Sequence, residues 1–152
     1  METDLVLDLA SGAAAVAVLV ALYVVVRRPP AIDASVDAAE LVVRFRGWDV
    51  VWTLRRQVRI PLGSIESVTV HRAESLWSGW WHRRLGTVIP GTIKAGWFGG
   101  SGGRELWDVR AGAEVVDLRL AESSRLRRLV VQVPDPVALA DSLTHARPRG
   151  AG

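Results

Sequence analysis

An uncharged run near the N-terminus, residues 9–26, constrains this chain more than any other feature. As a helix it would be about 27 Å long, close to the thickness of about 30 Å of a bilayer's hydrocarbon core. It is apolar all round, without the polar stripe of a helix on a soluble core. We therefore expect a single transmembrane helix over residues 6–26, within an anchor segment of residues 1–28.

A cleaved signal peptide is the main alternative for this run. Signal peptides begin with basic residues, whereas this chain begins with the acidic residues Glu2, Asp4 and Asp8. Arg-Arg-Pro-Pro follows at residues 27–30, which is typical of a stop-transfer flank and not of a small-residue cleavage site. Both flanks favour an uncleaved anchor.

The arginines also predict an orientation. No basic residue precedes Arg27, while Arg28, Arg44 and Arg46 follow closely. Basic residues remain on the cytoplasmic side of a membrane helix. We expect a single-pass protein of the plasma membrane with its N-terminus outside and its C-terminal domain in the cytoplasm.

Charge and composition limit the possible partners of that domain. The residues after the run carry 19 basic and 13 acidic groups, a net charge of +6. Such a mildly basic domain suits an anionic leaflet, but its charge is too weak and too mixed for dedicated nucleic-acid binding. The chain has no cysteine, which excludes disulfides and thiol chemistry.

Beyond a polar linker at residues 29–39, hydrophobic alternation predicts a mainly β domain at residues 40–146. Apolar and polar residues alternate over residues 41–46 and 48–54, on either side of Gly47, which is typical of a hairpin with one buried face. Further strands are expected at residues 58–60, 65–71, 87–98, 105–110, 114–120 and 126–133.

The last expected element is a helix. Asp135 can cap it, Pro136 suits its first position, and Arg147 with Pro148 would follow its end at Ala146. The prediction is therefore a bent antiparallel sheet or small barrel of about seven strands, closed by a C-terminal helix. Residues 147–152 are expected to form a flexible tail.

Two segments resemble the bacterial pleckstrin-homology-like domains. Residues 59–68 (Arg-Ile-Pro-Leu-Gly-Ser-Ile-Glu-Ser-Val) look like a characteristic strand of that family, and residues 133–143 are similar to its final strand and helix. Residues 89–91 and 95–98 match a membrane-anchored actinobacterial subset. The resemblance covers about residues 40–146 and implies the fold, but it supplies no ligand, cofactor or catalytic residue.

One segment stands out as a candidate contact site. Trp77, Trp80 and Trp81 lie beside Arg83 and Arg84. Indole rings favour the membrane interface, and arginines favour anionic headgroups. The segment is thus a candidate loop facing a membrane or a partner. The alternative, that the tryptophans fold back onto the sheet, remains open.

Other motifs do not indicate catalysis. The glycines of residues 99–103 lack the Lys-Ser/Thr ending of a phosphate-binding loop. His71, His82 and His145 have no spacing suited to a metal. We expect no catalytic residue, cofactor or metal.

These observations lead to one preferred function and two alternatives. The preferred function is a non-catalytic binding or scaffolding domain, held at the inner leaflet by a single membrane helix. Its partners would be membrane lipid, another protein or a second copy of the chain. The alternatives are an accessory structural subunit of a larger membrane complex and, more remotely, an unrecognised enzyme.

Overall fold

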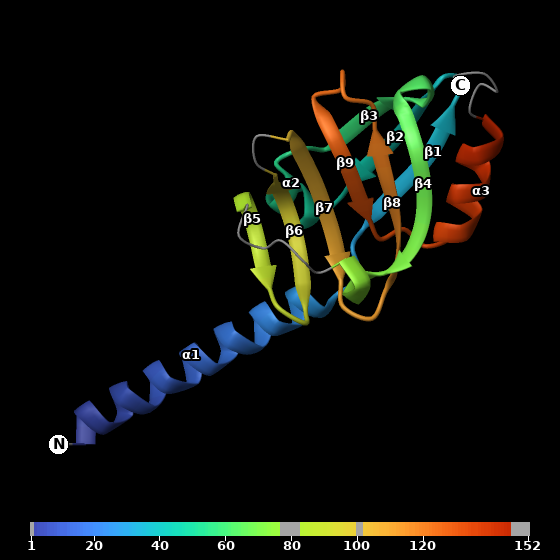
Figure 1. Cartoon of the computed structure of the whole chain (residues 1–152). Helices are drawn as coiled ribbons and strands as arrows, with labels where there is room; N and C mark the ends of the chain where they lie inside the picture. Colours follow the sequence, from blue (N-terminus) through green and yellow to red (C-terminus); the bar gives the residue numbers. More distant parts are fainter. Residues whose placement is uncertain (1, 77–82, 100–101, 147–152) are drawn as a thin grey trace.

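A long N-terminal helix projects from a domain of two β-sheets and shorter helices in the computed structural model (Figure 1). The structure describes residues 2–76, 83–99 and 102–146, and the side chains of all these residues except 2–10, 83 and 84. Helix α1 spans Glu2–Arg27. Within the described residues, no helix combines the length and the apolarity that a membrane crossing requires.

The first sheet contains three antiparallel strands in the order β1-β2-β3. Their bounds are Ile32–Asp37 for β1, Glu40–Phe45 for β2 and Gln57–Pro61 for β3. Leu41, Val43 and Phe45 are buried and Arg44 is exposed, which confirms the predicted strand and its faces. The linker prediction for residues 29–39 was wrong, because β1 lies there and pairs with β2 along its whole length.

The second sheet contains the remaining described strands in the order β4-β8-β9-β7-β6-β5. Strands β7 and β9 are parallel, and the other neighbours are antiparallel. In β8 and β9, Val116 pairs with Val131 and Leu118 pairs with Leu129, so both strands turn these buried residues to the same face. The bounds are β4 Ile65–Arg72, β5 Arg83–Ile89, β6 Ile93–Phe98, β7 Arg104–Arg110, β8 Glu114–Leu120 and β9 Leu126–Val131.

The prediction of one bent sheet or a small barrel was wrong. The described strands form two separate sheets, neither of which closes on itself. The break lies at Pro61, where β3 ends and a 3₁₀ turn, η1 (Leu62–Ser64), leads into β4 of the other sheet. Proline lacks the N–H of a ladder hydrogen bond, so it suits the end of the edge strand β3.

The second half of the predicted first hairpin was also wrong. Residues 48–54 do not form a strand, since Asp49–Thr53 is a short helix, α2. Asp49 and Thr53, one helical turn apart, are both buried, and the Thr53 hydroxyl donates to the Asp49 carbonyl oxygen at 2.7 Å. Leu54 ends the helix in the left-handed conformation. The side-chain partners of Asp49, the Ala31 amide and Arg110, come from distant parts of the chain, which alternation cannot reveal.

The C-terminal helix α3 (Pro136–Ala146) has the predicted bounds. The Ala138 amide donates to the Asp135 carboxylate at 2.9 Å, as expected of the cap. Leu139 and Leu143 are buried in the main apolar core, which lies between the two sheets. In Figure 1, α3 lies beside β1 and β4 at the opposite end of the domain from α1. The coarse prediction of a mainly β domain with a C-terminal helix is therefore confirmed.

Candidate functional site

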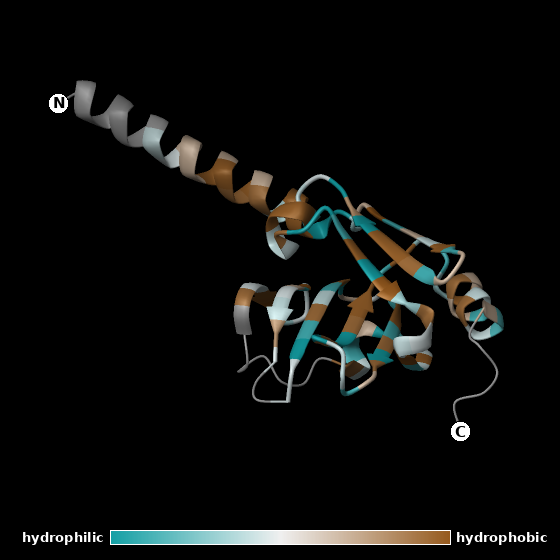
Figure 2. Ribbon diagram, turned by 90° about the horizontal axis from the view of Figure 1, so that it is seen from above, coloured by the Kyte–Doolittle hydropathy of each residue, from teal (hydrophilic) through white to brown (hydrophobic). Residues whose placement is uncertain are grey.

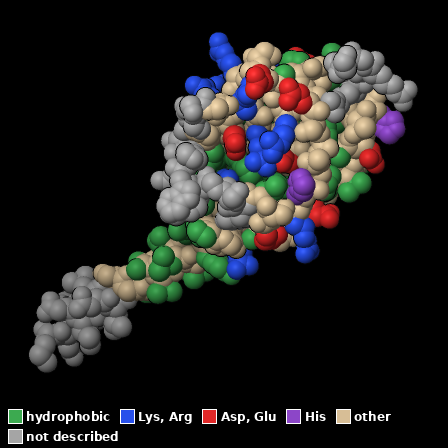
Figure 3. Space-filling model, viewed as in Figure 1, with side chains coloured by type: hydrophobic (Ala, Val, Ile, Leu, Met, Phe, Trp, Pro, Cys, Tyr) green, Lys and Arg blue, Asp and Glu red, His purple; other side chains and the backbone are tan. Residues whose placement is uncertain are grey.

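The end of α1 is joined to the domain by a small apolar contact. Val26 is buried against Ile93 and Ala95 of β6, with Trp52 of α2 packed beside them. In contrast, the large apolar side chains at residues 16–24 of α1 are 43–66% exposed. Figure 3 shows these hydrophobic side chains uncovered along the described part of the helix.

A buried ionic network lies next to this contact. Arg110 of β7 donates to Asp108 at 2.7 Å and to Asp49 of α2 at 2.9 Å. The second oxygen of Asp49 accepts the backbone N–H of Ala31 at 2.7 Å. The network thus connects β7, α2 and the segment that follows α1, and it fixes the point where the helix leaves the domain.

Two carboxylates share one guanidinium in this network. Burial, and then the charge of Asp49, raise the pKa of Asp108 to about 7, against the opposing influence of Arg110. The Asp108 Oδ2 and the Arg110 Nε are buried without a hydrogen-bond partner. The network can therefore hold a proton near neutral pH, because a buried site disfavours a second negative charge.

Helix α2 places apolar side chains outward on the other side of this network. Trp48, Val51 and Leu54 are 57%, 51% and 61% exposed. Leu85 and Ile89 of the neighbouring strand β5 are also exposed. We call these five residues the α2/β5 apolar surface. Within α2, Val50 and Trp52 pack inward beside the buried Asp49 and Thr53, so of its apolar residues only Val51 is exposed, between the exposed Trp48 and Leu54 at the two ends of the helix.

Arginines border this surface in two hollows. Arg28 and Arg46 line a hollow of about 150 Å³ together with Trp48 and Val25 of α1. Arg55 and Arg104 line a shallower hollow of about 420 Å³ beside Leu54 and Leu85. Exposed cations therefore lie beside exposed apolar groups at both ends of α2.

A second charged cluster lies on the six-stranded sheet, on the face opposite to the network of Asp49, Asp108 and Arg110. The Lys94 ammonium is 3.5 Å from the centre of the Trp107 ring, and the Arg128 guanidinium is 4.8 Å from it. Asp117 holds Arg128 through two hydrogen bonds of 2.8 Å. Figure 3 shows basic and acidic side chains together over this sheet. Two cations thus share one aromatic ring, an arrangement that cation–π attraction favours.

Lys94 has the lowered pKa typical of buried amines. Burial lowers its pKa to about 8, partly offset by Glu105. Such an amine could act as a base or nucleophile, but Lys94 is only 2% exposed, which leaves no access for a substrate. Sequence reasoning missed this residue, although it is the only lysine beside eighteen arginines.

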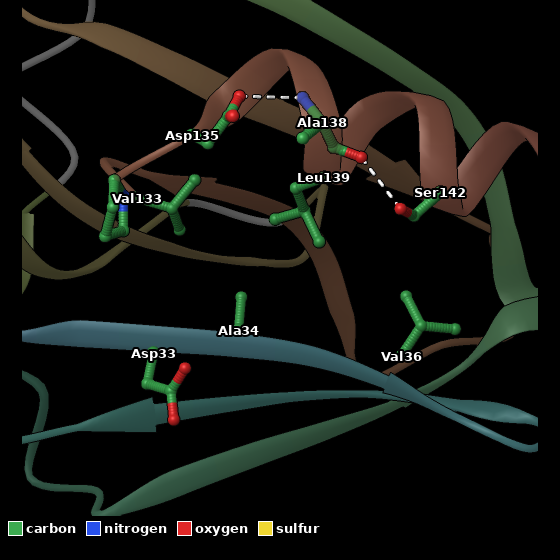
Figure 4. Close-up of a pocket in the computed structure, with 9 residues that line it drawn as sticks. Asp33, Ala34, Val36, Val133, Asp135, Ala138, Leu139 and Ser142 are labelled. Atoms are coloured by element: carbon green, nitrogen blue, oxygen red, sulfur yellow. Dashed lines mark hydrogen bonds between the residues drawn. The ribbon is translucent and has the colours of Figure 1, made fainter.

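An open cleft of about 440 Å³ separates α3 from the edge strand β1 (Figure 4). Ala34 and Val36 line one side, and Leu139 lines the other. Asp135 adds an acidic group at its rim, whereas the carboxylate of Asp33 points to the other side of β1 in Figure 4. Among the described strands, β1 pairs only with β2, so its outer edge remains open beside the cleft.

The residues predicted as a contact site are only partly described. Trp77, Trp80 and Trp81 lie outside the described residues. Arg83 and Arg84 belong to β5, but their side chains are not described. Whether this segment faces a membrane therefore remains a prediction. The described residues contain no group of His, Asp and Glu side chains that could hold a metal ion.

No protein-family model, curated protein or solved structure matches this chain. The resemblance to pleckstrin-homology-like domains therefore remains a prediction.

Proposed function

We propose that this chain is a single-pass membrane protein whose β domain is a non-catalytic binding module at the inner leaflet. The supporting observation is the exposure of α1. Its apolar side chains at residues 16–24 have no covering element, and among the described side chains of α1 only Val26 is fully buried against the domain. An apolar surface of this extent requires an apolar environment. Figure 2 shows the hydrophobic residues running along α1 as it extends away from the sheets.

The sequence supplies the rest of the argument for a membrane. The uncharged run of residues 9–26 lies within α1, and Arg27 and Arg28 follow it. Tyr23 packs under the Arg27 guanidinium at 5.2 Å, a pair suited to the headgroup region. The positive-inside rule places the domain in the cytoplasm.

The binding role is supported by the open edge of β1. An edge strand offers unpaired N–H and C=O groups to an incoming strand, and the cleft beside α3 offers room for its side chains. The partner would be a protein or a second copy of this chain. An accessory subunit of a larger membrane complex would use the same edge.

Flotation of membranes from expressing cells tests the anchor. We expect the full chain to float with the membranes after an alkaline wash. The double variant Val18→Arg, Leu19→Arg should remain at the bottom of the gradient, because each arginine at a helix centre costs about 3 kcal/mol on insertion. Val137→Arg, which changes an exposed residue of α3, is the matched control and should float. Release of the unmodified chain by alkali would contradict the proposal.

A further inference from the structure

The exposed apolar residues of the domain gather at one place. Among the described residues outside α1, the exposed large apolar side chains are those of the α2/β5 apolar surface and Val137 of α3. Single exposed apolar residues are common, but a group of them usually marks a contact surface. We therefore ask which partner contacts the α2/β5 apolar surface.

The surface is continuous with the end of α1. Trp48 lines the same hollow as Val25, the residue before the buried Val26. Val51 follows Trp48 by one helical turn, and Leu54 follows Val51. Leu54 in turn shares a hollow with Leu85 of β5. An apolar path therefore runs from the membrane helix across α2 to β5.

Charges along this path favour an anionic, amphipathic partner. Arg28, Arg46, Arg55 and Arg56 are all exposed beside it, and Arg46 lies 3.8 Å from the exposed carboxylate of Asp33. The nearby acid Asp49 faces inward and is neutralised by Arg110. Tryptophan favours the interface between water and lipid, and arginine favours anionic headgroups.

We propose that the α2/β5 apolar surface lies in the headgroup region of the leaflet that α1 enters, with the bordering arginines on anionic lipid headgroups. This inference rests on the proposed function, since α1 must first bring the surface to a bilayer. It explains why α2 buries Asp49 and Thr53 while it exposes Trp48, Val51 and Leu54.

The absence of native cysteine permits a direct test. Full-length single-cysteine variants Leu19→Cys, Val51→Cys, Leu54→Cys and Val137→Cys would carry a nitroxide label in vesicles of phosphatidylcholine and phosphatidylglycerol. Collision with oxygen, which concentrates in lipid, is compared with collision with a water-soluble nickel complex. Val137 is the matched control, because it is as exposed as Val51 but lies on α3.

We expect the ratio of oxygen to nickel accessibility to be highest at Leu19. It should be intermediate at Val51 and Leu54, severalfold above the value at Val137. In vesicles of phosphatidylcholine alone, the Val51 and Leu54 ratios should fall while the Leu19 ratio does not change.

Each other outcome overturns a defined part of the argument. If the accessibility ratios at Val51 and Leu54 equal the ratio at Val137 while the ratio at Leu19 is still high, the α2/β5 apolar surface does not contact lipid. That result would leave the proposed membrane anchor intact. Shielding of both positions from oxygen and nickel alike would indicate a protein contact in place of lipid. A water-exposed Leu19 would overturn the proposed function itself.

Discussion

The interior of the domain is apolar at the end covered by α3 and ionic at the end where α1 leaves. At the α3 end, the buried residues of the main core are all Ile, Leu, Val or Phe. At the α1 end, Asp49, Asp108 and Arg110 are buried between α2 and β7. The outer surface shows the reverse of the interior. At the α1 end, apolar residues are exposed to the outside on α2 and β5.

Under the proposed function, the two ends face different environments. An apolar core is what a protein surrounded by water requires. Buried charges cost free energy on desolvation, so we propose that this network fixes a geometry more than it adds stability. Here that geometry is the exit of α1, because Asp49 also holds the amide of Ala31.

The largest expected effect comes from removing the cation of the ionic end. Arg110→Met leaves Asp49 and Asp108 buried without a counter-charge, and we expect it to lower the free energy of unfolding by about 4 kcal/mol. Urea unfolding of the full chain in detergent, followed by tryptophan fluorescence, measures this loss.

A triple variant provides the control for that prediction. Combining Arg110→Met with Asp49→Asn and Asp108→Asn removes every charge of the network and should recover much of the lost stability. If Arg110→Met instead leaves the free energy of unfolding unchanged, the network is hydrated. The two ends of the domain would then not differ as described.

A smaller loss is expected at the apolar end. Leu118 is fully buried in the main core, on β8, between β4 and β9 of the six-stranded sheet. Leu118→Ala should cost about 3 kcal/mol through lost burial and a residual cavity. The control Val137→Ala, on the exposed side of α3, should change stability by less than about 0.5 kcal/mol in the same urea titration. Equal effects of the two would contradict the assigned core.

The smallest expected effect is a change in how the stability of the fold depends on pH. The pKa of Asp108 is raised to about 7 in the folded chain, so between its ordinary value and 7 the folded state keeps a proton that the unfolded state has lost. Stability from this group is therefore complete at low pH and declines as the pH rises towards 7.

Asp108→Asn should flatten this decline. Unfolding midpoints of the full chain, measured across this range for the native and variant proteins, isolate the contribution of Asp108 as their difference. Asp33→Asn, which changes an exposed acid, should leave the profile of the native chain unaltered. A profile of Asp108→Asn identical to that of the native chain would contradict the shared-proton network.

Most strands and the last helix could be predicted from local pattern. The alternation at residues 114–120 and 126–133 predicted the strands β8 and β9, because one face of each strand is buried. Their register in the sheet came only from the structure. Asp135 and Pro136 predicted the start of α3, because capping is a property of adjacent residues.

The missed elements depend on partners far away in sequence. Residues 48–54 alternate like a strand, but the partner of Asp49 is Arg110, and no local pattern records it. Strand β1 looked like a polar linker because its outward residues, such as Asp33 and Asp37, are polar on an edge strand. Of the candidate site, the sequence indicated the apolar run and the arginines, but neither the ionic network nor the buried Lys94.

The sequence by itself determined the long apolar run, most strands, the C-terminal helix and the absence of thiol chemistry, because these follow from neighbouring residues or from composition. Only the tertiary structure decided that the strands form two sheets, that β9 inserts between β7 and β8, and that α2 turns its polar side inward. These choices depend on long-range pairing of strands and charges, whose free energy exists only once distant segments have met.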